Sequence, residues 1–111
     1  MPPSRPLDRL AALQRADGSW DPSKELAAGL GVSKDAIERG AASRGWATTA
    51  ARQAWATALA LAWLEARASA DRDEWALLAD KARDWLRQKG GAGEPDAWMC
   101  EAQEFVRSLR V

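Results

Sequence analysis

The chain has 111 residues, and its 16 lysines and arginines are balanced by 16 aspartates and glutamates. It contains seven tryptophans and one cysteine, but no histidine and no tyrosine. Alanine and leucine supply 37 residues, whereas valine, isoleucine and threonine supply seven, a balance that favours helices over strands. We therefore expect one all-α domain and exclude an all-β fold. The lack of histidine excludes imidazole acid-base catalysts and histidine metal sites, so we expect no catalytic residue, metal or cofactor.

The charge distribution gives no sign of a nucleic-acid or membrane partner. Residues 1 to 70 carry nine basic and seven acidic side chains, and residues 71 to 111 carry seven and nine. The longest uncharged apolar run, from Ala54 to Leu64, has 11 residues, about half the length of a membrane-spanning helix. The N-terminus lacks the apolar stretch of a secretory signal, and the lone Cys100 has no partner for an internal disulfide. These features predict a cytoplasmic protein.

Three short helices are expected in the first forty residues, each bounded by residues typical of helix ends. Serine and aspartate side chains accept hydrogen bonds from the first amides of a helix, and glycine adopts the left-handed conformation that often follows the last turn. We expect residues 1 to 5 to be flexible and residues 6 to 111 to form a single helical interaction domain. The expected short helices run from about Pro6 to Arg15, from Ser23 to Gly31, and from Ser33 to Gly40.

Three longer stretches follow a connector at residues 41 to 46. The first, roughly Ala47 to Ala68, is apolar on nearly all sides, which predicts a helix enclosed by the others. A fifth helix is expected from Asp71 to Gly90, where Asp71, Asp73 and Glu74 match a capping box and complement the helix dipole. A sixth begins at Glu94-Pro95. The sequence thus predicts a compact bundle of five to six helices around a central helix rich in tryptophan and alanine.

Most of the tryptophans are in phase with the expected inner faces. On the central helix, one broad side is formed by Trp55, Leu59, Ala62, Trp63 and Ala66. Trp75, Trp85 and Trp98 fall on the inner sides of the last two helices, so core packing is a better interpretation than ligand stacking. Trp20 and Trp46 lie in connectors: we expect Trp20 to be buried, whereas Trp46 fits a lid over a helix end and an exposed contact equally well.

Leu77 is the anomaly of the fifth helix, because it stands opposite the apolar stripe. Its neighbours on that side are charged or polar and include Lys81 and Asp84. A single exposed leucine is ordinary, but an apolar residue ringed by charges is also how a partner contact is built. The candidate partner-binding residues are therefore Leu77, Lys81, Asp84 and Trp46. Cys100 is expected on an exposed side of the sixth helix as an ordinary thiol, since no histidine is present to activate it.

Two stretches resemble a known domain. The first runs from Leu10 through Gln14 and Asp17-Gly18-Ser19-Trp20 to Leu30-Gly31-Val32-Ser33. The second has Trp55-Ala56-Thr57, then Glu74-Trp75, then Lys81-Ala82 and Trp85. Both resemble the C-terminal domain of proteins that combine a vault protein inter-alpha-trypsin domain with a von Willebrand factor A domain, and the second, which fits in order and spacing, is the more specific. The connector from Gly40 to Ala54 is longer than that pattern expects.

A more divergent relative of that domain is the region of vault poly(ADP-ribose) polymerase that binds major vault protein, the shell subunit of the vault particle. The resemblance therefore implies a non-catalytic domain that docks on major vault protein. The alternative is a structural or self-association module of a larger protein.

The string from Gln14 to Trp20 also resembles the repeat of terpene cyclases, in which glutamine and tryptophan tie the helices of an α/α barrel together. One copy cannot build a barrel, so an enzyme of that kind is the weakest hypothesis. The resemblance does imply that Trp20 packs on the first helix and that Gln14 hydrogen-bonds across a turn.

Overall fold

The computed structural model describes residues 6–43, 49–89 and 95–108, and in these ranges the chain forms the six expected α-helices. Residues 1–5 and Trp46, about which the sequence made predictions, lie outside the described residues. One turn of 3-10 helix, η1 (Ser69–Asp71), precedes the fifth α-helix. The α-helices are α1 (Pro6–Leu13), α2 (Lys24–Leu30), α3 (Lys34–Ser43), α4 (Thr49–Arg67), α5 (Arg72–Lys89) and α6 (Pro95–Ser108).

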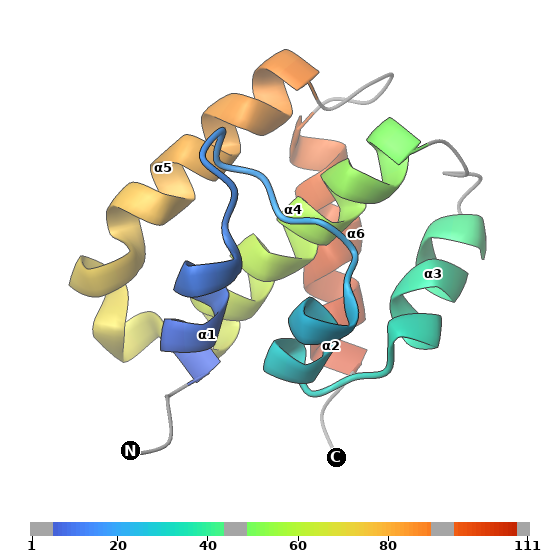
Figure 1. Ribbon diagram of the computed structural model, residues 1–111, viewed down its shortest axis with the longest axis horizontal. Helices are drawn as coiled ribbons and strands as arrows, with labels where there is room; N and C mark the ends of the chain where they lie inside the picture. The colour runs from blue at the N-terminus through green and yellow to red at the C-terminus, as the bar shows by residue number, and fades with distance from the viewer. Residues whose placement is uncertain (1–5, 44–48, 90–94, 109–111) are drawn as a thin grey trace.

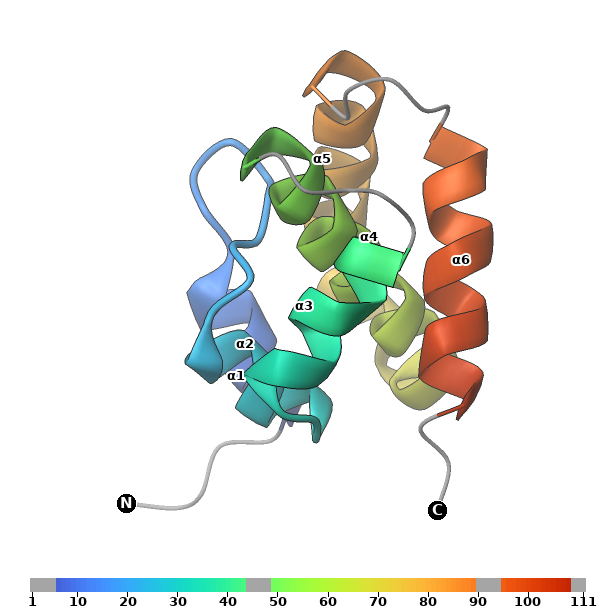
Figure 2. The same cartoon turned by 90° about the vertical axis from the view of Figure 1, so that its right-hand side faces the viewer.

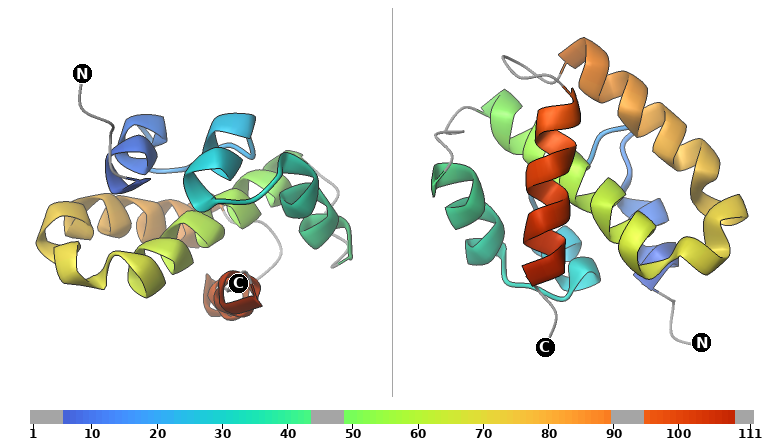
Figure 3. Two further views of the ribbon diagram at one scale, coloured as in Figure 1. Left: turned by 90° about the horizontal axis from the view of Figure 1, so that it is seen from below. Right: turned by 180° about the vertical axis from the view of Figure 1, so that it is seen from behind.

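The helices are stacked in layers around α4, as Figure 3 shows from below. Helices α4 and α5 form the middle layer, α1 and α2 lie on one side of it, and α6 lies on the other side. Helix α3 flanks the end of this arrangement beside α4 (Figures 1 and 2). The enclosure of α4 explains its sequence: all residues from Ala54 to Ala62 are buried. The predicted all-α bundle with a central Trp/Ala-rich helix is confirmed.

Helix α2 begins and ends, and α3 begins, where the capping residues predicted, whereas α1 ends at Leu13, two residues before the expected Arg15. Ser23 accepts a hydrogen bond from the amide of Leu26 at 3.1 Å, and Ser33 accepts one from the amide of Ala36 at the same distance. Gly31 ends α2 with φ of 80°, and its N–H donates to the carbonyls of the last turn. Each cap satisfies backbone groups that the helix itself leaves unpaired.

The predicted end of α3 at Gly40 is wrong, because the helix continues to Ser43. Gly40 lies inside α3 with no positive φ, but it packs unusually close to two aromatic rings. A Cβ atom at Gly40 would lie 3.2 Å from Cζ2 of Trp55 and 3.3 Å from Cε2 of Phe105. Those two rings meet edge to face, with centroids 5.5 Å apart. Glycine is used here for the close approach of three helices, which local sequence does not reveal.

The tryptophans fill the core and pair their indole N–H groups. Trp20, Trp55, Trp75 and Trp85 are buried, as predicted, while Trp63 is partly buried against the same cluster. The side chain of Trp98 lies outside the described part. The N–H groups donate to backbone carbonyls in three cases: Trp20 to Leu10 at 2.9 Å, Trp55 to Ile37 at 3.1 Å, and Trp75 to Ala68 at 2.7 Å. These bonds remove the cost of burying a polar indole group.

One residue of α4 differs from the expected pattern, and an ion pair that the sequence did not predict joins α4 to α5. Ala66, which was assigned to the inner side of α4, is exposed near the end of that helix. Close to it, Arg83 of α5 donates to Glu65 of α4 at 2.9 Å and ties the two helices together at the surface. In the described ranges, no helix combines the length and the apolar character that crossing a membrane requires.

Candidate protein-interaction surface

The turn between α1 and α2 is fastened directly to the backbone of α5. Gly18 has φ of +99°, and a Cβ atom there would lie 2.6 Å from the carbonyl oxygen of Lys81. Beside it, the Gln14 amide donates to the carbonyl oxygens of Gly18 at 3.0 Å and of Leu78 at 2.9 Å. Only glycine combines this conformation with this approach. The predicted hydrogen bond of Gln14 across the turn is confirmed, and the same side chain also reaches α5.

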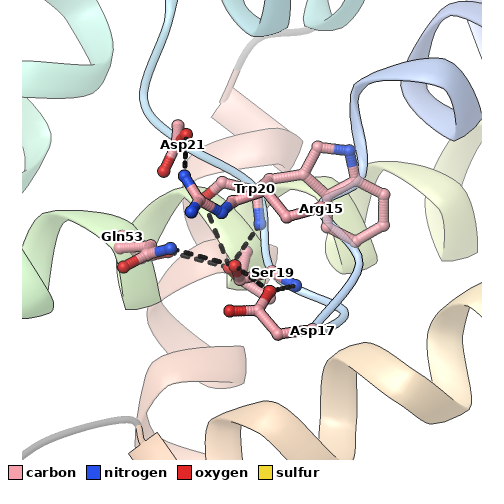
Figure 4. A network of polar contacts seen from close by, with 7 residues as sticks. Arg15, Asp17, Ser19, Trp20, Asp21 and Gln53 are labelled. Atoms are coloured by element: carbon pink, nitrogen blue, oxygen red, sulfur yellow. Dashed lines mark hydrogen bonds and ion pairs between the residues drawn. The ribbon is translucent and has the colours of Figure 1, made fainter.

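A second set of hydrogen bonds fastens the turn to α4, as Figure 4 shows. The buried Ser19 hydroxyl donates to Oδ1 of Asp17 at 2.6 Å and accepts from Nε2 of Gln53 at 2.9 Å. The next amide, that of Trp20, donates to Oγ1 of the buried Thr57 at 3.0 Å. Gln53 and Thr57 are one helical turn apart on α4. The turn is therefore held between the two helices of the middle layer.

Asp17 is the member of this network that faces solvent. The hydrogen bond from the Ser19 hydroxyl lowers the pKa of Asp17 below its ordinary value, and the Ser19 amide adds to the effect. The charge of Arg15 and a hydrogen bond from the Trp85 indole act in the same direction, while partial burial opposes them. Asp17 is thus an ionised carboxylate in a fixed position. Next to it, Arg15 forms an exposed ion pair with Asp21 at 2.8 Å.

A shallow pocket of about 270 Å³ opens where the turn meets α5. Trp85, only 7% exposed, contributes to its wall. The lining residues are Asp17, Lys81, Asp84, Trp85 and Gln88. Three of them come from one stripe of α5 that starts at Leu77 and continues through Lys81, Asp84 and Gln88, at spacings that share a helix face.

Leu77, at the start of this stripe, is 78% exposed. No other large hydrophobic side chain in the described part of the chain is as exposed to solvent. Lys81 and Asp84 are exposed one and two turns further on, and Asp84 also pairs with Arg87. The structure therefore brings three of the four predicted contact residues together. We call Leu77, Lys81, Asp84 and the adjoining pocket the α5 surface.

A second hollow lies between α1 and α2. It has a volume of about 340 Å³ and is lined by Ala12, Leu13 and Ala28, with Glu25 as its charged residue. We call it the α1–α2 groove. The sequence did not predict it, because the outward alanines of two short helices carry no distinctive pattern. Asp17 was also missed as part of a surface, although the Asp17-Gly18-Ser19-Trp20 motif had been noted for its packing.

Cys100 is exposed on α6, as predicted. It lies on the helix that covers the opposite face of the middle layer from α1 and α2 (Figure 3). The acidic residues Asp73 and Glu74 occupy the first turn of α5, where they complement the helix dipole. None of these residues belongs to the α5 surface.

The fold and these surfaces define a small all-α domain that offers shallow contact sites on its exterior. No protein-family model matches the chain, and no solved structure matches it. The chain is 33% identical over 103 residues to von Willebrand factor A domain-containing protein 5A of Mus musculus and 37% identical over 102 residues to its Homo sapiens counterpart. A von Willebrand factor A domain-containing protein of Dictyostelium discoideum is 30% identical over 92 residues.

These matches cover most of this chain but a small part of each relative. The mouse and human matches span 93% and 92% of the chain and 12% of each relative, and the Dictyostelium match spans 80% of the chain and 4% of the relative. The similarity to von Willebrand factor A domain-containing proteins that the sequence motifs predicted is confirmed. It concerns one short segment of much longer proteins.

Proposed function

We propose that this chain is a non-catalytic protein-protein interaction domain that docks on major vault protein through the α5 surface. The observation that carries the protein contact is Leu77, an apolar side chain that is 78% exposed one helical turn before Lys81, which lines the charged pocket. Contact sites of this form exclude water around a central apolar residue. The relatives support such a role, because a segment of similar length recurs within much larger proteins.

The choice of partner has separate support. It comes from the resemblance of the Leu10 to Ser33 and Trp55 to Trp85 stretches to the domain that is related to the vault-binding region of vault poly(ADP-ribose) polymerase. On this proposal the domain works in the cytoplasm, as its single cysteine also suggests. A catalytic role has little support, since the 111 residues include no histidine and one copy of the cyclase-like string.

Co-sedimentation with assembled vault shells tests the proposal. The wild-type chain is expected to pellet with shells at concentrations of tens of micromolar, roughly the affinity of small, weak interfaces. Leu77→Asp should reduce the pelleted fraction by about tenfold or more, because it places a charge at the centre of the contact. The matched control is Gln103→Asp, which puts the same charge at an exposed position of α6.

The outcomes separate the partner from the surface. If the wild-type chain does not pellet with shells, major vault protein is the wrong partner. If Leu77→Asp pellets as well as wild type, the partner stands and the α5 surface is wrong. The second hypothesis, a structural or self-association module, would be favoured by absence of shell binding together with a concentration-dependent mass of the chain alone.

A further inference from the structure

The α1–α2 groove has the apolar lining of a site for a side chain of another molecule. Its volume of about 340 Å³ is more than enough for a leucine side chain, and its walls are two alanines and a leucine. Ala12 and Ala28 are exposed there, so the groove is open to another molecule. The charged lining residue is Glu25, a carboxylate. An occupant that fits is therefore an apolar side chain with a basic group nearby.

The chain itself carries that combination at Leu77. Leu77 is 78% exposed, and Lys81 follows it by four residues on the same face of α5. Because Leu77 is exposed in the structure, it does not occupy the groove of its own chain. A leucine that enters the groove of a second copy would bring Lys81 toward Glu25 at the rim. Leu77 would then be covered by the apolar walls of the groove, and Lys81 would lie near a carboxylate of opposite charge.

From this complementarity we propose that two copies of the chain associate head to tail, with Leu77 of one copy seated in the α1–α2 groove of the next and Lys81 paired with Glu25. The two surfaces differ, so the contact does not close on itself as a two-fold dimer would, and further copies can add. The contact is small, so association is weak, with a dissociation constant of about 0.1 to 1 mM. This inference goes beyond the proposed function and does not depend on major vault protein, although one Leu77 cannot serve both contacts at once, so shell binding and self-association should compete.

Sedimentation of the full 111-residue chain tests the contact without any other protein. The weight-average mass of wild type should rise with concentration between about 0.02 and 2 mM and pass the mass of a dimer. Leu77→Asp removes the apolar side chain, and Ala28→Glu places a carboxylate in the groove. Both positions are exposed, so the variants should fold, and each alone should stay monomeric. Gln103→Asp should behave as wild type.

Mixing the two variants gives the sharpest result. Leu77→Asp keeps an intact groove and Ala28→Glu keeps an intact leucine, so the mixture should form a dimer and nothing larger. A mixture that stays monomeric would overturn the proposal, as would a wild-type chain that is monomeric at 2 mM, a concentration about twice the weakest expected dissociation constant. Association that persists in Ala28→Glu would also overturn it, because the groove would then not be the acceptor.

The charge pair is tested by exchange. Glu25→Lys and Lys81→Glu each put like charges together, and each should weaken association by roughly threefold to tenfold. The double variant restores an opposite pair between copies and should recover most of the wild-type association. If the double variant is as weak as the single ones, Glu25 and Lys81 do not meet and the proposed orientation is wrong.

Discussion

The close approach of Gly18 to α5 gives a prediction that separates two reasons for a glycine at a position, a positive φ and a lack of space for a Cβ atom. Gly18 and Gly31 are the described glycines with positive φ, +99° and +80°. A Cβ atom at Gly18 would lie 2.6 Å from the carbonyl oxygen of Lys81, whereas one at Gly31 would meet nothing within 4 Å. Gly31→Ala therefore tests backbone conformation alone. Gly18→Ala tests conformation together with the contact.

The magnitudes follow from the geometry. A left-handed conformation costs an ordinary residue roughly 1–2 kcal/mol, and both variants incur it. At Gly18 the turn must also retreat by about 1 Å to restore a normal carbon-to-oxygen separation. That movement would break the 2.9 Å hydrogen bond from Gln14 to Leu78, a net loss of about 0.5–1.5 kcal/mol. We expect destabilisation of roughly 1–2 kcal/mol for Gly31→Ala and roughly 1.5–3.5 kcal/mol for Gly18→Ala.

Urea unfolding, followed by tryptophan fluorescence and circular dichroism, measures both values. Alanine also restricts the unfolded chain relative to glycine, but this gain is common to the two variants and cancels in the comparison. The slope of free energy against urea should stay the same, so that the midpoint reports stability. Equal destabilisation of the two variants, within about 0.5 kcal/mol, would refute the claim that the turn is packed tightly on α5.

Three further predictions concern the network and the α5 surface. Thr57→Val keeps the side-chain shape but leaves the buried amide of Trp20 without its acceptor. It should therefore lower the free energy of unfolding, measured in urea, by about 1–3 kcal/mol. Thr57→Ser keeps the hydroxyl and should lose less stability than Thr57→Val. The pKa of Asp17 is lowered in the folded state, so the ionised carboxylate stabilises the fold. This stabilisation is complete above the ordinary aspartate pKa of about 3.9 and is lost as pH falls through the lower folded value. Unfolding midpoints of Asp17→Asn should therefore fall less steeply below about pH 4 than those of wild type, and parallel curves would contradict the role of Ser19. Leu77→Asp should change stability by less than about 0.5 kcal/mol, because the side chain is exposed; a larger loss in thermal or urea unfolding would mean that Leu77 packs within its own chain.

Local patterns in the sequence were sufficient for the helices and for most of the core. The apolar stripe of α5 and the all-round apolar character of α4 predicted which sides are buried, because helical periodicity fixes which residues share a face. Serine and glycine caps predicted both ends of α2. The burial of Trp20 was expected from its type and position, and its packing on α1 was implied by the resemblance of the Gln14 to Trp20 string to a known helix-tying motif.

The errors and omissions arise from contacts between residues far apart in the chain. Gly40 looked like a helix end by composition, yet Trp55 and Phe105, which leave little room for a Cβ atom there, come from two other helices. The hydrogen bonds from Gln53 to Ser19 and from Trp20 to Thr57 likewise join a turn to a helix more than thirty residues away. Helix periodicity contains no information about which turn meets which helix. The sequence could identify Leu77 as unusual, but not the pocket beside it.

The turn links the stability of the core to the shape of the α5 surface. Asp17, at the edge of the pocket, is held by Ser19, which is held in turn by Gln53 of α4, while Gly18 sets the distance between the turn and Lys81. A substitution that pushes the turn away from α5 should therefore alter the pocket as well as the stability of the fold. Gly18→Ala should consequently weaken any docking through the α5 surface at temperatures where the variant is still folded. Gly31 lies at the end of α2, away from the contact between the turn and α5. Gly31→Ala should therefore leave docking unchanged when it is compared at the same folded fraction. A contact that responds equally to both variants would depend on overall stability and not on the position of this turn.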